Sequence, residues 1–183
     1  MNELMQSATL RGIEQLGVLV ENLAPQLKQT ALHERQLKTQ IQQRLYQAGI
    51  EVLPEEYIIA NGLPYLYVNI NIMNTTMGLY VFATRVSLKQ TALLSREPFS
   101  ELYTSTWETG GVGTVGVNNV TDVVGSIRQH IDQFCRDYLA ENVDLGSSGN
   151  SGPGKLKALL HSRQRLCWWI EQSPTASSAS QNV

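Results

Sequence analysis

The chain has 183 residues, of which 42% are hydrophobic and 16% are charged, and its formal net charge is −2. These totals are typical of a folded globular protein, and a domain of this size can bury a core without a metal or a disulfide. The slightly acidic balance argues against a general nucleic-acid binder, and the two cysteines, which lack a C-x-x-C spacing, argue against zinc. We therefore expect neither a metal ion nor a cofactor.

The sequence also bears on cellular location. It contains no run of apolar residues as long as the ~18 that a membrane-spanning helix needs. Its first residues, MNELMQSATLRG, lack the basic and apolar regions of a secretory signal. The chain as written is therefore expected to be cytoplasmic, and a periplasmic or cell-envelope location is the alternative if a leader has been removed.

The first predicted elements are a strand, a helix and a short strand. LGVLV at residues 16–20 is a short apolar run that suits a buried strand. Apolar residues recur at helical spacing in HERQLKTQIQQRLYQAGI, residues 33–50, and Gly49 stands where a helix C-cap is common. IEVL at residues 50–53 predicts a short additional strand.

Three longer strands follow. YLYVNINIMN at residues 65–74 alternates between apolar and polar side chains and is the clearest strand in the chain. LYVFATRVSLKQTALL at residues 79–94 alternates for long enough to be an antiparallel return strand. LYTSTWET at residues 102–109 predicts a third strand, with Tyr103 and Trp107 on one face.

The last predicted element is a second amphipathic helix. Apolar residues between Val120 and Leu139 form one stripe, with Asn119 as the expected N-cap and Asp122 in the first turn. Because both helices carry a single apolar stripe, the sequence predicts an α+β fold, a two-layer sandwich with a mainly antiparallel sheet of about four strands and both helices on one face. The other sheet face is expected to stay half uncovered.

The domain is expected to span residues 13–142. A Gly/Ser-rich linker is predicted at residues 143–154, where GSSGNSGPG has the composition of a flexible coil. A basic amphipathic segment is predicted at residues 155–172, and residues 173–183 have a composition typical of disorder.

GGVGTVG at residues 110–116 contains the G-x-G-x-x-G spacing of dinucleotide-binding loops, at Gly111, Gly113 and Gly116. In a dinucleotide fold the helix starts within this motif, and a parallel strand that carries an acid follows the helix. Here the predicted helix starts later, and a linker follows it. The sequence therefore favours a glycine-rich strand end or hairpin, and an anion or small-ligand loop that includes Asn119 is the alternative.

The sequence shows no catalytic constellation. The histidines form no H-x-x-x-H or H-E-x-x-H pair, and G-x-S-x-G and P-loop motifs are absent. His130, Asp137 and Glu141 are expected on the solvated side of the last helix, and Cys135 is expected to be a buried structural cysteine. These observations favour a protein without catalytic activity.

Aromatic side chains are the candidate partner surface. Tyr65, Tyr67, Tyr103 and Trp107 are expected to line the uncovered sheet face. Their plain role is packing in cross-strand pairs. Their functional role would be contact with a protein partner or with a second copy of the chain, because aromatic residues are enriched at interfaces.

A basic segment, KLKALLHSRQRLCWWI at residues 155–170, combines leucines on one helical face with basic side chains and tryptophans. This composition suits a membrane surface or an acidic partner groove. The interpretation that we favour is a short helix folded back on its own domain, or a poorly ordered extension. The candidate residues are Lys155, Lys157, Arg163, Arg165, Trp168 and Trp169.

Several runs occur in a characteristic order between Ile13 and Asn142: GVLVENL, RLYQAGIEVL, LPYLYVNINI, GLYVFATRVSLKQTALLSR, TSTWETGGVGTVG and IRQHIDQFCRDYLAEN. Together they resemble an uncharacterised bacterial α+β domain family whose members usually begin with an export signal. The order of elements is also loosely similar to small domains of cell-envelope assembly proteins. The resemblance implies no activity, substrate or catalytic residue.

Three functions follow from these features. The leading hypothesis is a non-catalytic binding or assembly module that uses the open sheet face, with self-association as one form. The first alternative is a small-ligand or anion-binding protein, or an enzyme, that acts at the glycine-rich stretch. The second alternative is a peripheral membrane protein attached through residues 155–170.

Overall fold

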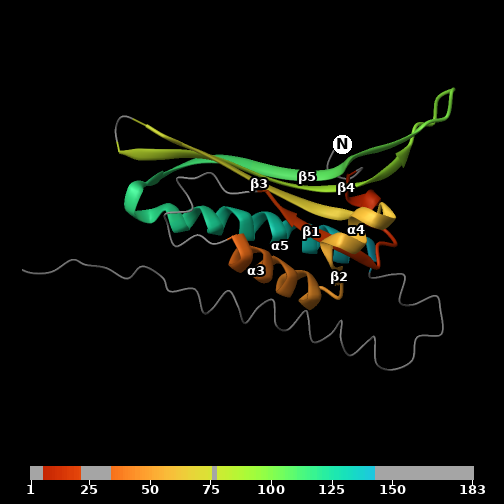
Figure 1. Cartoon of the computed structure of the whole chain (residues 1–183), viewed down its shortest axis with the longest axis horizontal. Coiled ribbons are helices and arrows are strands. Elements are labelled where there is room, and N and C mark those ends of the chain that lie inside the picture. The colour runs from red at the N-terminus through yellow and green to blue at the C-terminus, as the bar shows by residue number, and fades with distance from the viewer. Residues whose placement is uncertain (1–5, 22–33, 76–77, 143–183) are drawn as a thin grey trace, which may run out of the picture.

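The computed structural model describes residues 6–21, 34–75 and 78–142, and shows an α+β fold of two main layers. The strands form one layer, and helices α3 and α5 lie side by side in the layer beneath it (Figure 1). In chain order the elements are η1 (Ala8–Leu10), β1 (Gln15–Val20), α3 (Glu34–Gln47), β2 (Glu51–Leu53), α4 (Glu55–Asn61), β3 (Tyr65–Asn74), β4 (Leu79–Leu93), β5 (Glu101–Gly116), η2 (Val117–Asp122) and α5 (Val123–Asn142).

The sheet has five strands in the order β2-β1-β3-β4-β5. Strands β3, β4 and β5 are antiparallel neighbours, as the alternating sequence predicts. Strand β1 pairs parallel with both β2 and β3, so the predicted antiparallel sheet is largely present but is mixed and has five strands instead of about four. Helix α3 lies between β1 and β2 in the sequence and supplies the long crossover that a parallel pair requires.

The hydrophobic core lies between the sheet and the pair of helices α3 and α5. Each element contributes the residues of one face, which alternate along the strands and recur at helical spacing along the helices. The core residues include Leu16, Val18, Leu37, Ile41, Leu45, Leu66, Val68, Val86, Leu88, Ile127, Ile131 and Phe134. The predicted apolar stripes of both helices are therefore confirmed.

The helices differ from the prediction in number. Helix α3 is confirmed, and Gly49 follows it with a φ of 84°, a conformation that glycine adopts at little cost. Helix α4 is an additional short helix that the sequence pattern does not predict. Its Ile58 lies over Gly17, where an added Cβ would be 2.5 Å from the Ile58 Cγ1 atom. Because Gly17 alternates with core residues of β1, α4 covers this part of the opposite sheet face.

The start of the last helix also differs from the prediction. The chain leaves β5 through the 3₁₀ turn η2, and Asn119 lies inside this turn with a φ of −116° and a ψ of 23°. Asp122 is the last residue of η2, and α5 begins at Val123. The expected N-cap at Asn119 and first-turn acid at Asp122 are therefore wrong, because a tight 3₁₀ turn precedes the α-helix.

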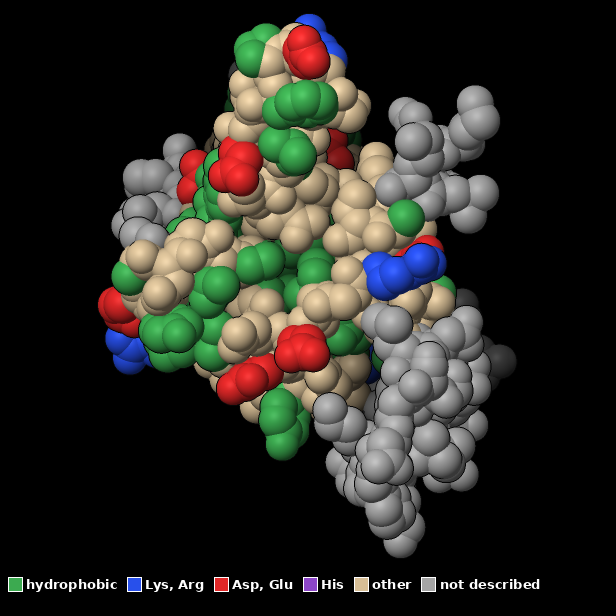
Figure 2. Space-filling view, turned by 90° about the vertical axis from the view of Figure 1, so that its right-hand side faces the viewer, with side chains coloured by type: hydrophobic (Ala, Val, Ile, Leu, Met, Phe, Trp, Pro, Cys, Tyr) green, Lys and Arg blue, Asp and Glu red, His purple; other side chains and the backbone are tan. Residues whose placement is uncertain are grey.

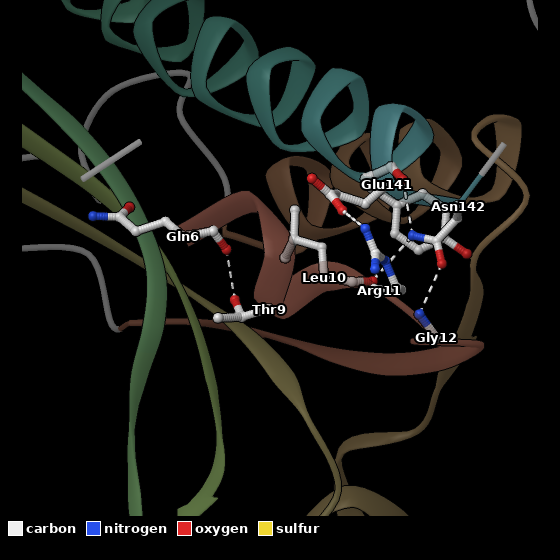
Figure 3. A network of polar contacts seen from close by, with 8 residues as sticks. Gln6, Thr9, Leu10, Arg11, Gly12, Glu141 and Asn142 are labelled. Atoms are coloured by element: carbon white, nitrogen blue, oxygen red, sulfur yellow. Dashed lines mark hydrogen bonds and ion pairs between the residues drawn. The ribbon is translucent and has the colours of Figure 1, made fainter. Parts of the chain in front are cut away.

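The turn before β1 is joined to the end of α5 by an ion pair and hydrogen bonds (Figure 3). Leu10 is fully buried in the core. Arg11 forms an ion pair of 2.8 Å with Glu141, and the Gly12 N–H donates to the Asn142 Oδ1 atom at 2.8 Å. The Asn142 side chain in turn donates to the Leu10 carbonyl at 3.0 Å. Glu141 thus has a partner across the fold, which differs from the solvated position expected for it.

Candidate functional site

A β-bulge in β5 determines which aromatic side chains lie on the open face of the sheet. The open face is the one opposite helices α3 and α5. Two consecutive residues of β4 pair with Trp107 and Ser105, so Thr106 is an extra residue in β5. An extra residue reverses the alternation of faces beyond it. Tyr103 therefore lies on the open face, whereas Trp107 points toward the helices and is 2% exposed. The prediction that both side chains share the open face is wrong.

Trp107 belongs to the core between β5 and α5. Its indole Nε1–H donates to the Asp137 Oδ2 atom at 2.9 Å, and its ring meets the Phe134 ring edge to face with centroids 5.0 Å apart. Asp137 was expected on a solvated helix face, but the buried indole gives it a partner on the sheet side. Trp107 is thus an anchor for α5 and cannot contribute to a partner surface on the open face.

Two tyrosines form an aromatic pair on the open face. The rings of Tyr65 and Tyr103 have centroids 5.8 Å apart. The Tyr103 hydroxyl lies 3.2 Å from the Leu63 carbonyl oxygen and 3.3 Å from that of Lys89. Burial, together with the neighbouring Tyr65, raises the pKa of Tyr103 to about 12. The phenol therefore stays neutral near pH 7 and keeps its proton as a hydrogen-bond donor.

A row of polar side chains crosses the same face. The Tyr67 hydroxyl donates to the Glu21 Oε2 atom at 2.6 Å, and the Asn69 amide donates to the same oxygen. The Asn71 amide donates to the Asn69 Oδ1 atom at 2.5 Å. The hydrogen bonds from Tyr67 and then Asn69 lower the pKa of Glu21, and the bond to Glu21 raises the pKa of Tyr67. The row therefore keeps an ionised carboxylate in a fixed position.

These polar groups line a broad, open hollow with a volume of about 820 Å³. Arg85 on β4 and Glu108 on β5 add exposed charges of opposite sign to its lining. The lining residues on the open face include Glu21, Tyr67, Asn69, Asn71, Ala83, Arg85, Glu108, Gly110 and Val112. Such a surface can bind a polar partner through several hydrogen bonds and ion pairs at once.

The β4–β5 hairpin extends this side of the molecule beyond the helix layer (Figure 1). Leu93, Phe99 and Leu102 are exposed on it. Figure 2 looks onto this end of the molecule, where apolar side chains gather beside acidic and basic ones at the top of the hairpin. The open side thus combines a polar centre with an apolar projection at one end.

The glycine-rich stretch is part of β5. It pairs with β4 in continuous register up to Gly116, so it is a strand and not a phosphate-binding loop. Gly113 lies beneath the Phe82 ring, and Gly111 faces His130. Asn119 is exposed in η2. The structure confirms the strand interpretation of GGVGTVG, and the anion or small-ligand alternative that includes Asn119 stays a prediction.

A partly buried polar cluster lies on the helix side of this stretch. The Thr84 Oγ1 atom is 2.9 Å from the Ser126 Oγ atom and 3.0 Å from the His130 Nε2 atom. Gly111 lies next to the imidazole, and an added Cβ there would be 3.8 Å from the ring, which is ordinary contact. His130 therefore ties α5 to β4, and its expected solvated position is wrong. A threonine at a core-facing position of a strand was the available signal, because buried polar groups need partners.

Protonation of His130 is expected to destabilise the fold. Burial lowers the pKa of His130 below its ordinary value of 6.5, so the unfolded chain binds the proton more tightly than the folded chain does. The stabilisation by the neutral ring is thus complete above pH 6.5 and is lost as the pH falls through the folded-state pKa. A titration followed by NMR should give a pKa below 6.5 for His130.

Urea unfolding at about pH 7 and about pH 5.5 provides the matching stability measurement. The His130→Gln variant should lose less stability over this interval than the unmodified chain. Equal losses in the two proteins would show that other groups account for the pH dependence.

A second hollow, of about 260 Å³, lies between α3 and α5. Its lining includes Arg44, whose Nε–H donates to the Asp132 Oδ1 atom at 2.5 Å and joins the two helices. Cys135 lies on the same layer and is buried, and burial raises its pKa to about 12. The interpretation of Cys135 as a structural cysteine is therefore confirmed.

Within residues 6–21, 34–75 and 78–142, no cluster of three or more histidines, cysteines or acids is placed to hold a metal ion. In the same part of the chain, no helix combines the length and apolar character needed to cross a membrane. The linker, the basic segment and the tail predicted at residues 143–183 lie outside the described residues. The candidates that lie there are Lys155, Lys157, Arg163, Arg165, Trp168 and Trp169.

No family model matches the sequence, and no curated protein does. Among solved structures, the chain is similar to a PelC dodecamer from Paraburkholderia phytofirmans, with 14% identity and a TM-score of 0.40 over 70% of this chain and 90% of that chain. It is also similar to a minor lipoprotein from Acinetobacter baumannii, with 10% identity and a TM-score of 0.32 over 72% of this chain and 91% of that chain.

A third similar structure is the rare lipoprotein B from Shewanella oneidensis, with 10% identity and a TM-score of 0.25 over 86% of this chain and 99% of that chain. Two of these three structures are lipoproteins by name. All three TM-scores lie below 0.5, so the similarities identify neither the function nor the location of this chain. The cytoplasmic and cell-envelope locations both stay predictions.

Proposed function

We propose that this protein is a non-catalytic assembly module that binds a protein partner through the open face of its sheet. The observation that carries the proposal is the unequal covering of the two sheet faces. Helices α3 and α5 bury one face, whereas on the other face the described part of the chain places α4 over β1 and leaves β3, β4 and β5 uncovered. A sheet face left in this state is available for contact with another molecule.

The chemistry of the uncovered face suits a protein partner. Tyrosine and arginine are enriched at protein interfaces, and Tyr65, Tyr67, Tyr103 and Arg85 all lie on this face. Tyr67 and Tyr103 are already held by hydrogen bonds. Their side chains therefore lose little conformational entropy when a partner binds.

The titration behaviour of this face favours recognition over proton transfer. A general acid or base works best with a pKa near the operating pH. Here the pKa of Glu21 is lowered, and the pKa of Tyr103 is raised to about 12. Both groups therefore keep a fixed protonation state near pH 7, which suits stable hydrogen bonds with a partner.

The charges on this face favour a partner with polar groups of both signs. Arg85 is positive, whereas Glu21 and Glu108 are negative, and all three line the same hollow. Nucleic-acid backbones and acidic membrane surfaces carry one sign of charge, and the two carboxylates would repel them. A protein surface with mixed charge is the better complement.

The proposal is tested by retrieving partners from an extract of the native cell with the tagged full-length chain. Arg85→Glu reverses an exposed charge on the open face, and Arg35→Glu makes the same change on α3 in the opposite layer. We expect Arg85→Glu to reduce recovery of a specific partner by about tenfold, which corresponds to about 1.4 kcal/mol. Arg35→Glu should leave recovery unchanged. Equal recovery with both variants would contradict the proposed surface.

A further inference from the structure

Strand β5 forms one edge of the sheet, and the direction of its outer backbone groups can be assigned. The Glu108 N–H donates to the Gln6 Oε1 atom, so it points away from β4. In a regular antiparallel ladder, every second residue directs both backbone groups the same way. The register is continuous from Glu108 to Gly116, so Gly110, Val112 and Thr114 present their N–H and C=O groups outward.

Described residues cover only the part of this edge that lies next to the bulge. Gln6 bonds the Glu108 N–H, and the Thr9 hydroxyl lies 3.3 Å from the Thr106 carbonyl oxygen. Figure 3 shows Gln6 and Thr9 on the segment that crosses here. Beyond Glu108, no described side chain or strand bonds the outward groups of Gly110, Val112 and Thr114. Among the described residues, the edge is thus paired next to the bulge and unpaired along the glycine-rich stretch.

The open part of the edge lacks the features that prevent strand pairing. Natural edge strands are usually protected by charged side chains or proline. The sequence from Thr109 to Thr121 contains neither, and Val112 is 79% exposed. Glycine within a strand often marks a place where another backbone approaches closely. Gly116 is not required by the fold, since an added Cβ there would meet nothing within 4 Å.

We propose that β5 pairs antiparallel with β5 of a second copy of this chain, about a twofold axis at Val112. The inference goes beyond the proposed function, because it assigns self-association to the β5 edge of the sheet and not to the open face. In this register Val112 lies opposite Val112 of the second copy, and Gly110 lies opposite Thr114. The outward N–H and C=O groups of all three residues are then satisfied, and the two sheets become one.

The charge distribution favours a second copy in this arrangement. Each Glu108 lies opposite Gly116 of the other copy, so the nearest acids on the two strands are far apart. A pair about a twofold axis uses the same surface on both copies and closes on itself, which explains how an unprotected edge avoids continued addition of strands. An unrelated extended peptide would satisfy the same backbone groups and is one outcome of the test.

The test uses Val112→Lys and Val112→Glu in the full-length chain, studied by sedimentation velocity over a concentration series. The twofold axis places the substituted residues directly opposite each other, where like charges destabilise a strand pair. Each variant alone should be monomeric, and an equal mixture of the two should recover the dimer. Met73→Lys and Met73→Glu are the controls, because Met73 is exposed near the end of β3. Both variants should form the same dimer as the unmodified chain.

The inference would be overturned by an unmodified chain that is monomeric at every concentration, by a dimer that survives both Val112 substitutions, or by a mixture that stays monomeric. A monomeric chain that binds another protein's strand at Val112 would also overturn it. In each case, loss of partner recovery in Arg85→Glu would leave the proposed function standing. Conversely, a Val112-dependent dimer with equal recovery by Arg85→Glu and Arg35→Glu would contradict the open-face proposal alone.

Discussion

Replacing Trp107 by alanine is expected to lower the free energy of unfolding by about 3–5 kcal/mol. The indole is 2% exposed and packs against Phe134, so its removal leaves a cavity between β5 and α5. The same change removes the donor that bonds Asp137. Urea unfolding followed by far-UV circular dichroism measures the effect.

Tyr103→Ala is the matched control, because it lies on the same strand but before the bulge. Its ring is 46% exposed, so the expected loss is about 1 kcal/mol. A loss for Tyr103→Ala as large as that for Trp107→Ala would contradict the assignment of the two side chains to opposite faces.

Gly110→Ala is expected to destabilise the fold by about 1–3 kcal/mol, whereas Gly111→Ala should change the stability by less than about 1 kcal/mol. A Cβ at Gly110 would lie 2.7 Å from the Thr84 carbonyl oxygen, and this backbone atom cannot move without disturbing the β4–β5 ladder. A Cβ at Gly111 would meet only the His130 ring, at 3.8 Å, which is ordinary contact.

Thermal unfolding of the two alanine variants under identical conditions measures this difference. The two substitutions are chemically the same and are one residue apart, so effects on the unfolded chain nearly cancel in the comparison. Similar melting temperatures for the variants would contradict the register of the glycine-rich stretch on β4.

The periodic parts of the fold could be predicted from the sequence, because periodicity reports which face is buried. The alternation in β3 and β4 and the helical spacing in α3 and α5 all correspond to observed elements. The parallel edge formed by β1 and β2 could not be predicted in the same way. A short apolar run that is buried on both faces carries no alternation and no indication of strand direction. Helix α4 was missed because seven residues show too little periodicity.

The candidate site was less predictable, because it depends on register. The extra residue Thr106 moves Trp107 to the core, and no residue pattern around TSTWET indicates that bulge. Glu21 joins Tyr67 and Asn69 only because β1 pairs parallel with β3. The aromatic surface predicted from sequence is therefore present as Tyr65, Tyr67 and Tyr103, and the polar groups between and beside them come from the topology.

Photocrosslinking can show whether the open sheet face is the surface that binds a protein partner. Benzoylphenylalanine replaces Tyr67 on the open face in one variant and Tyr46, which is 79% exposed on α3, in the other. After irradiation in the native cell, we expect protein adducts from position 67 and none from position 46. Adducts from position 46 without any from position 67 would contradict the open-face proposal.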